Sequence, residues 1–357
     1  MTDLKPRIDL WRTPATRVAV AGGRNSRLAE ETERELRSAR QVELIQRPLL
    51  EADGTVAREV AESDVLISGG AKLDDAVFNQ LKRVRFVLRP YVGYDDIDVD
   101  AATRHGILFA NVPDTFIEEV ANQTMAFVLA TNRKVRDMDV YVREGKWSAG
   151  GRARDAARPI QRVSALTLGF VGFGNIARLV LERARPFGFR FLAADPYVSA
   201  DAAAAVGVEL VSLEELMRQS DIVSVHVFLN AETRGLINAE RLRLMKSTAY
   251  LVNTSRGPVI DEAALIETLR ARRIAGAALD VFEIEPVAAD NPLLNMDNVL
   301  LSPHIASYSE EGDARHQIRI AEIALGVVNG GMPERKVVVN KGLYDELAAQ
   351  LEPARAR

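Results

Sequence analysis

A glycine-rich turn near the middle of the chain constrains the fold most. An apolar run ends in Gly-x-Gly-x-x-Ala and leads into a helical pattern, in the segment LGFVGFGNIA that spans residues 168–177. Gly172 permits a tight turn, Gly174 lacks a Cβ and lets the backbone approach a pyrophosphate, and Ala177 allows helix and strand to pack closely. The start of the helix offers N–H groups and a positive dipole end. The pattern predicts a dinucleotide site with contacts from Gly172, Gly174, Asn175 and Ile176.

An acidic residue follows the turn at the distance expected for a ribose contact. Asp195 closes the next apolar stretch, about 20 residues downstream of the glycines. Its carboxylate can accept hydrogen bonds from the adenosine ribose diol and would repel a 2′-phosphate, and no Arg follows to neutralise such a phosphate. The spacing therefore favours NAD over NADP. The same carboxylate could instead cap a helix or fold the turn before Pro196.

Composition narrows the class of protein. The 357 residues suggest two domains of ordinary size. The 46 Lys and Arg nearly balance the 50 Asp and Glu, so we expect neither a nucleic-acid partner nor a polybasic membrane anchor. The absence of cysteine excludes disulfides, thiolate metal sites and cysteine nucleophiles. Residues 1–14 lack the apolar core of a signal peptide, so we expect a cytoplasmic protein. We also expect no metal site.

Two series of alternating strands and helices lie on either side of residue 140. The first covers residues 17–112, and the second begins at residue 166. Strands that alternate with helices predict the α/β class, with doubly wound parallel sheets covered by helices on both faces. The second series has about six strand candidates, as a nucleotide domain of this type needs. They are residues 166–171, 190–194, 222–227, 249–253, 275–281 and 299–301.

The segments outside the two series are predicted as connections. A long helix is expected over residues 114–133, with Asp114 or Thr115 as its cap. Residues 143–163 have weak periodicity and are interpreted as a connecting arm. The chain after residue 307 is too short for a third domain, so we expect it to pack on the first.

Three polar residues of different chemistry stand near the ends of strand candidates in the second series. They are Arg256, Glu285 and His304, and ligands of open α/β sheets collect beyond the carboxyl ends of the strands. His304 is the natural proton donor, Glu285 would orient its ring, and Arg256 would bind a carboxylate or carbonyl oxygen. Each residue also has a structural alternative. His304 could be a hydrogen-bonded structural histidine, and Arg256 could cap a helix or pair on the surface. Glu285 could be a surface loop charge, and Glu283 is the rival candidate for the catalytic carboxylate.

At these residues the chain resembles the D-isomer-specific 2-hydroxyacid dehydrogenases, over roughly residues 64–340. The resemblance rests on the segments LGFVGFGNI from residue 168, NTSRGPVIDE from 253, ALDVFEIEP from 278 and SPHIA from 302. It implies that Arg256, Glu285 and His304 are catalytic, with Glu285 preferred to Glu283. It further implies that Asp280 contacts the nicotinamide carboxamide of NAD. Thr254 is expected beside the cofactor as well.

The resemblance also implies an architecture of two Rossmann-like domains that flank a cleft. Residues 1–112 and 307–357 would form a discontinuous, flavodoxin-like substrate domain, and residues 113–306 the NAD-binding domain. Members of the family are usually dimers built through the nucleotide domain, so we expect a homodimer.

A short glycine-containing loop in the first series matches the family segment that binds the substrate carboxylate. Ser68, Gly69 and Gly70 would present backbone N–H groups to that carboxylate, with Arg256 as a further substrate contact. The alternative is an ordinary turn between strand and helix.

The substrate itself stays open at this point. The leading expectation is NAD-dependent interconversion of a small 2-oxo acid and its D-2-hydroxy acid. A 3-phosphoglycerate dehydrogenase is one alternative, for which Lys72 and Arg89 are the evident cations near the Ser68 loop. An NAD(H)-sensing, corepressor-like binding protein is another, because such proteins keep the same three polar residues. The segment Arg89-Pro90-Tyr91 is bulkier than the Ala-Gly of many relatives.

Overall fold

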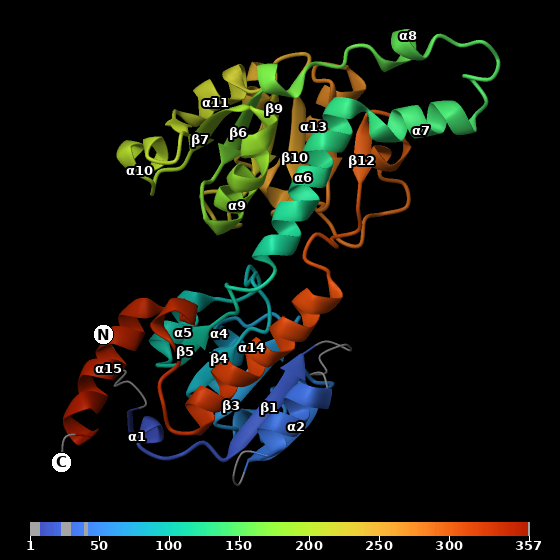
Figure 1. The fold of residues 1–357 in the computed structure, drawn as a ribbon. Coiled ribbons are helices and arrows are strands. Elements are labelled where there is room, and N and C mark those ends of the chain that lie inside the picture. Colours follow the sequence, from blue (N-terminus) through green and yellow to red (C-terminus); the bar gives the residue numbers. More distant parts are fainter. Residues whose placement is uncertain (1–7, 23–29, 39–41, 356–357) are drawn as a thin grey trace. The chain divides into compact units, whose positions relative to one another are not determined.

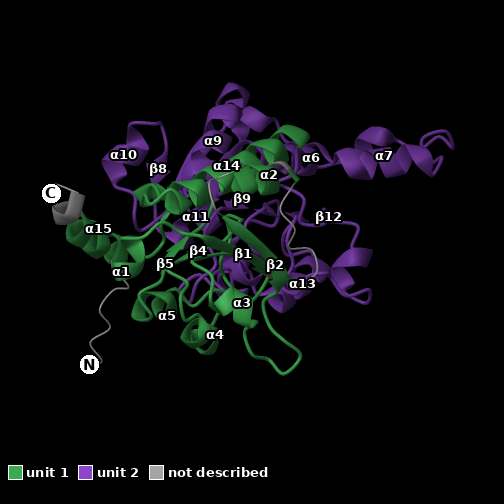
Figure 2. Cartoon of the chain, turned by 90° about the horizontal axis from the view of Figure 1, so that it is seen from below, with its two compact units in different colours: residues 1–115, 310–357 green, residues 116–309 purple. Residues whose placement is uncertain are grey.

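The chain forms two compact units, which Figure 2 colours separately. The computed structural model describes residues 8–22, 30–38 and 42–355. Unit 1 contains Met1–Thr115 and Glu310–Arg357, and unit 2 contains Phe116–Ser309. Both crossings lie three residues beyond those expected from the sequence, at 115/116 against 112/113 and at 309/310 against 306/307.

The sheet of unit 1 has five parallel strands in the order β2-β1-β3-β4-β5. This is the flavodoxin-like order, which reverses direction between β1 and β3 and places ligands at the carboxyl ends of the strands. The strands are β1 Arg17–Gly22, β2 Glu43–Pro48, β3 Val65–Gly69, β4 Phe86–Leu88 and β5 Leu108–Ala110.

Helices cover both faces of this sheet because successive strand residues point to opposite sides. Val18 and Val20 pack in one core with the two C-terminal helices, and Ala19 and Ala21 pack in the other core with α3, α4 and α5. Figure 1 shows α14 beside α2 on its side of the sheet. The helices are α1 Ile8–Trp11, α2 Glu30–Ser38, α3 Arg58–Ala61, α4 Asp75–Gln80, α5 Val99–Arg104, α14 Glu310–Val328, η5 Arg335–Val337 and α15 Lys341–Arg355.

The sheet of unit 2 has seven parallel strands in the order β12-β11-β10-β9-β6-β7-β8. Its first strand, β6, lies between β7 and β9, which is the Rossmann arrangement. The sequence predicted six of these strands and missed β8, because two residues at a sheet edge carry no apolar run. The strands are β6 Thr167–Val171, β7 Arg190–Ala194, β8 Glu209–Leu210, β9 Ile222–Val225, β10 Tyr250–Asn253, β11 Gly276–Leu279 and β12 Val299–Leu301.

Helices also pack on both faces of the sheet in unit 2. Phe170 and Val252 lie in a core with α6 and α9, whereas Val225 and Leu251 lie in a core with α11, α12 and α13. The helices are α6 Ile117–Arg133, α7 Val135–Arg143, α8 Ala153–Ala157, η1 Val163–Ala165, α9 Asn175–Ala184, η2 Arg185–Phe187, α10 Ala200–Ala204, α11 Leu213–Gln219, α12 Ala239–Leu244, η3 Gly257–Val259, α13 Glu262–Arg270 and η4 Pro292–Asn295.

The predicted cap of the long helix is wrong. The residue before α6 is Phe116, which has a positive φ of 63° and makes no side-chain capping bond. Asp114 instead pairs with Arg319 at 3.1 Å, and Thr115 hydrogen-bonds the ring of His316 at 2.9 Å. The bonds of both side chains therefore go to α14 and not to the start of α6.

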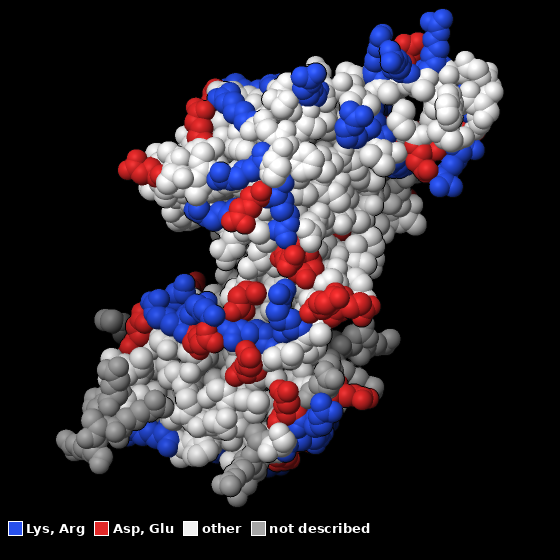
Figure 3. All heavy atoms as spheres, viewed as in Figure 1, with Lys and Arg blue, Asp and Glu red and all other residues white. Residues whose placement is uncertain are grey.

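The surface carries charges of both signs. Lys and Arg are interspersed with Asp and Glu on the faces of the two units that Figure 3 presents. Within the described residues, no helix combines the length and apolarity needed to cross a membrane.

Candidate active site

The glycine turn of unit 2 is built around Gly172, at the end of β6. Gly172 has a φ of +85°, and a Cβ there would approach Val227 to 2.8 Å and the His226 carbonyl oxygen to 3.0 Å. Glycine is therefore required both by the backbone conformation and by the packing against the chain after β9. Ala177 is fully buried, as the predicted contact between helix and strand needs.

The space beside Gly174 is open. Gly174 is the N-terminal cap of α9 and has an ordinary negative φ, and a Cβ there would meet no atom within 4 Å. No side chain caps the start of α9, where the N–H groups of the first turn begin at Asn175. An open, uncapped helix start after a tight turn fits the pyrophosphate of a dinucleotide. The residues present therefore fit NAD.

The carboxylate of Asp195 is hydrogen-bonded to the glycine turn. It follows β7, and its Oδ2 accepts the Phe173 N–H at 2.8 Å while its Oδ1 accepts the Tyr197 N–H at 2.8 Å. The carboxylate thus folds the turn before Pro196, which was its alternative role. A half-buried carboxylate with one backbone donor on each oxygen keeps acceptor capacity, so the predicted ribose contact is compatible with this geometry.

His304 and Glu285 meet in unit 2. The Nδ1 atom of His304 lies 2.6 Å from Glu285 Oε2, and Glu285 Oε1 accepts the Phe282 N–H at 2.9 Å. An ionised carboxylate only accepts hydrogen bonds, so Nδ1 carries the hydrogen and Nε2 is left for another partner. His304 has a positive φ of 52°, and this uncommon conformation in a non-glycine residue is a form of strain that concentrates at functional sites.

The ionisation of Glu285 follows from its surroundings. Burial favours the neutral acid, but the bonds from His304 and from the Phe282 N–H, together with the charge of Arg256, hold the pKa of Glu285 below its ordinary value. Glu285 is therefore a carboxylate near neutral pH, and it can accept the hydrogen bond from the His304 ring.

Arg256 is positioned by the turn that follows β10. The buried side chain of Asn253 accepts the Ser255 N–H at 3.0 Å and donates to the Arg256 carbonyl at 2.9 Å. A Cβ on Gly257 would come within 1.8 Å of the Phe282 carbonyl oxygen, so the loop of Arg256 and the loop of Glu285 pack backbone against backbone. Sequence reasoning missed Asn253, although an Asn at the end of a buried strand and before Thr-Ser is a turn signal.

Asp280 organises the segment that carries His304. Its carbonyl accepts the His304 N–H at 2.7 Å, and its fully buried carboxylate accepts the N–H groups of Ile305 at 3.0 Å and Ala306 at 2.9 Å. The Ser302 hydroxyl donates to the same carboxylate. The expected contact of Asp280 with nicotinamide stays a prediction, and its internal bonds give the residue a supporting role that the sequence did not suggest.

Thr254 is also engaged within unit 2. Its buried hydroxyl lies 2.9 Å from that of Thr124, which itself donates to the Val120 carbonyl at 2.8 Å. Thr254 therefore donates to Thr124 and ties the turn after β10 to α6. Its predicted cofactor contact stays a prediction.

The predicted carboxylate loop lies in unit 1, at the end of β3. Ser68 is fully buried, so only its backbone suits the expected role, and Gly70 has a φ of +73° with open space around its Cβ position. Glycine is thus favoured at position 70 by its conformation. This loop and the three polar residues of unit 2 come from different compact units.

Comparisons with known proteins agree with the geometry. Residues 125–306 match the family model described as D-isomer specific 2-hydroxyacid dehydrogenase, NAD binding domain. The chain is 42% identical over 287 residues to a glyoxylate reductase of Korarchaeum cryptofilum, covering 79% of this chain and 85% of the relative. It is 37% identical over 297 residues to a D-3-phosphoglycerate dehydrogenase of Methanocaldococcus jannaschii, covering 83% of this chain and 55% of the relative.

A solved structure of a related protein has a similar fold. The D-lactate dehydrogenase from Aquifex aeolicus, complexed with NAD and lactic acid, superposes with a TM-score of 0.76 at 26% identity and covers 88% of this chain and 96% of that one. The chain therefore belongs to the D-isomer specific 2-hydroxyacid dehydrogenases, which are NAD-dependent oxidoreductases that interconvert 2-oxo acids and 2-hydroxy acids.

Proposed function

We propose that the enzyme reduces a small 2-oxo acid of the glyoxylate class and that His304 supplies the proton. The observation that carries this proposal is the 2.6 Å contact between His304 Nδ1 and Glu285, which leaves Nε2 for the substrate oxygen. Bound NADH supplies the hydride. His304 protonates the carbonyl oxygen during reduction and takes the proton back in the reverse direction, while Glu285 stabilises the charged ring. Arg256 holds the substrate carboxylate or the developing oxyanion.

The remaining predicted contacts are proposed on the same basis. Gly172, Gly174, Asn175 and Ile176 bind the pyrophosphate, Asp195 binds the ribose, and Thr254 and Asp280 lie beside the nicotinamide. Support comes from the open start of α9 and from the bond between Asp195 and the glycine turn. The backbone N–H groups of the Ser68–Gly70 loop bind the substrate carboxylate, supported by the positive φ of Gly70.

The choice of a glyoxylate-class substrate is supported by the identities to the two relatives. The chain is 42% identical to the glyoxylate reductase and 37% identical to the phosphoglycerate dehydrogenase over the matched residues. The deciding experiment measures NADH oxidation with glyoxylate, hydroxypyruvate, pyruvate and phosphohydroxypyruvate. Highest kcat/KM with glyoxylate or hydroxypyruvate supports the proposal, and highest kcat/KM with phosphohydroxypyruvate overturns the substrate assignment. Saturable NADH binding without turnover of any acid would favour the sensing protein instead.

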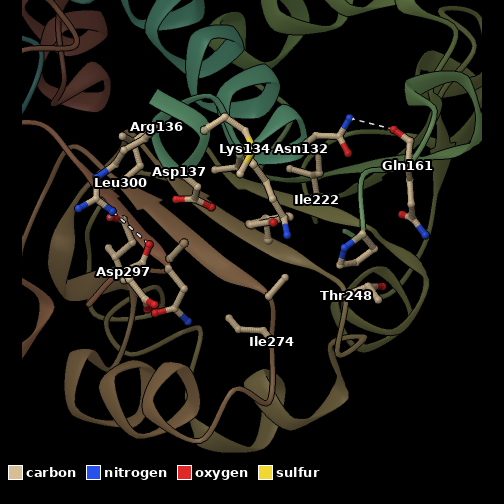
Figure 4. A pocket seen from close by; sticks show the side chains of 18 of the residues that line it. Asn132, Lys134, Arg136, Asp137, Gln161, Ile222, Thr248, Ile274, Asp297 and Leu300 are labelled. Carbon is tan, nitrogen blue, oxygen red and sulfur yellow. Dashed lines mark hydrogen bonds between the residues drawn. The ribbon is translucent and has the colours of Figure 1, made fainter. Parts of the chain in front are cut away.

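We also propose that two copies of the chain pair through unit 2. The exposed helix α7 has no buried residue, and Val135, Val140, Val142 and Trp147 are exposed apolar side chains on and after it. Figure 4 looks into a cavity of about 580 Å³ beside the same helix, lined by Asn132, Lys134, Arg136 and Asp137 at the junction of α6 and α7 together with residues of β9, β10 and β12. Exposed apolar groups next to a cavity are typical of a surface that another protein covers.

Sedimentation equilibrium tests this pairing. The unchanged chain is expected to sediment as a dimer, and Val142→Asp as a monomer, because a charge in an apolar interface is costly. Phe187→Asp is the matched control, since Phe187 is an exposed apolar residue elsewhere in unit 2. A monomeric unchanged chain, or a Val142→Asp variant that remains dimeric, would contradict the proposal.

A further inference from the structure

Arg89 is a buried arginine next to the predicted carboxylate loop. It follows β4, and because β3 and β4 are parallel neighbours, it lies at the same sheet edge as Ser68. Its side chain donates from Nη1 to the Ser68 carbonyl oxygen at 3.2 Å, and from Nη2 to both oxygens of Asp96, at 2.9 and 2.6 Å. The residue is only 7% exposed, so this charge is held within unit 1.

The segment around Arg89 holds the start of the loop and the chain that follows it. The start of the loop is held through the bond from Arg89 to the Ser68 carbonyl. The chain three residues after the loop is held because the Leu73 N–H donates to the Asp96 carbonyl at 3.0 Å and the Asp98 N–H donates to the Leu73 carbonyl at 2.8 Å. Asp96 therefore takes part in both attachments, through its carboxylate in the first and its backbone in the second.

The charge of Arg89 is neutralised where it lies. Asp96 supplies the compensating carboxylate, and the ring of Tyr91 lies 5.5 Å from the guanidinium carbon. Tyr91 in turn stacks on His316, whose Nε2 lies 3.0 Å from the Pro90 carbonyl oxygen. The other cation expected near the loop, Lys72, is 75% exposed and pairs with Asp74 at 3.5 Å.

We infer that Arg89 is the positioning residue of the Ser68–Gly70 loop and that Asp96, by neutralising it, restricts the enzyme to 2-oxo acids with a single anionic group. The inference rests on the proposed function and specifies the substrate class. In the proposed function, the loop binds one carboxylate with its N–H groups. A second anion near the loop would meet the carboxylate of Asp96, and that carboxylate already compensates the buried charge of Arg89, which selects against dianionic acids.

The matched substrate pair for the test is hydroxypyruvate and phosphohydroxypyruvate, which differ only by a phosphate. Asp96→Asn keeps the size of the side chain and an acceptor for Nη2 but removes the negative charge. We expect it to raise kcat/KM for phosphohydroxypyruvate relative to hydroxypyruvate by about tenfold or more, because the charge of Arg89 is then uncompensated. A merely structural role of Asp96 would lower both values together.

The positioning role is tested with Arg89→Met and Arg89→Lys. Arg89→Met is expected to raise KM for hydroxypyruvate about tenfold with a smaller change in kcat, because it loosens the carboxylate loop. Arg89→Lys keeps the charge and one donor and should recover part of the loss. The Kd for NADH should stay unchanged in both. Arg104→Met is the control, since Arg104 is an exposed, ion-paired arginine of the same unit.

The outcomes separate this inference from the proposed function. A substrate ratio that is unchanged in Asp96→Asn overturns the specificity role, and a KM in Arg89→Met equal to that of the control overturns the positioning role. If Arg89→Met does not fold, Arg89→Lys carries the second test. An unchanged enzyme that is active on hydroxypyruvate while both variants behave like the control refutes only this inference. An unchanged enzyme that reduces no 2-oxo acid refutes the proposed function and the inference together.

Discussion

The ring nitrogen Nδ1 of His304 lies 2.6 Å from Glu285 Oε2, and this contact determines which ring nitrogen is left for chemistry. Because the carboxylate can only accept, the ring donates from Nδ1 and presents Nε2 to the substrate. The backbone supports the same orientation, since the His304 N–H donates to the Asp280 carbonyl at 2.7 Å. The histidine is therefore fixed at both its ring and its backbone by residues of unit 2.

Replacement of His304 by Gln should remove the proton donor and leave the cofactor site intact. We expect kcat for 2-oxo acid reduction to fall by about 10²-fold or more, the range typical of a lost general acid. The Kd for NADH, measured by the quenching or enhancement of its fluorescence, should change less than about twofold. Full activity in this variant would exclude His304 as the acid.

Replacement of Glu285 by Gln should lower the rate of reduction. The pKa of Glu285 lies below its ordinary value, so the residue is a carboxylate at neutral pH and accepts the bond from the His304 ring. An amide can present a donor as well as an acceptor, so it fixes the tautomer and orientation of the ring less firmly. We therefore expect kcat to fall by about tenfold or more.

The measurement is kcat at neutral pH for the reduction of the best substrate. Glu283→Gln is the matched control, because Glu283 was the rival carboxylate in the sequence and lies in the same loop. A loss of kcat in the Glu283 variant and not in the Glu285 variant would reverse the assignment of the two residues.

The parallel-sheet class and the glycine turn could be predicted from the sequence because both have local signatures. The alternation of apolar strands and helices predicts the sheets, and the glycine at position 172 is explained by its positive φ and its close contact with Val227. The supports of the site could not be predicted in the same way. Thr124 lies 130 positions before its partner Thr254, and no local pattern indicates such a contact. The left-handed Phe116 was missed because bulky residues rarely adopt that conformation.

Asp280→Asn should destabilise unit 2 and weaken catalysis at the same time. The buried carboxylate accepts the N–H groups of Ile305 and Ala306, and an amide would turn a donor toward one of these groups. We expect a loss of about 2–3 kcal/mol in the free energy of unfolding, measured by urea denaturation. Asp297→Asn is the control, because Asp297 is 80% exposed and its change should cost less than about 0.5 kcal/mol. Equal stability of the two variants would contradict the supporting role of Asp280.

Gly172→Ala should weaken NADH binding more than Gly207→Ala, although both substitutions place an L-residue at a positive φ. The positive φ of +85° alone costs an L-residue about 1–2 kcal/mol. The added Cβ would also lie 2.8 Å from Val227 and displace the turn that faces the pyrophosphate. Gly207 is the matched control, because its φ is +69° and a Cβ there would meet nothing within 4 Å. Both variants should therefore lose similar backbone stability, whereas only Gly172→Ala should raise the Kd for NADH, by about tenfold or more. Equal NADH affinities in the two variants would mean that the turn at Gly172 is only a packing feature of the sheet.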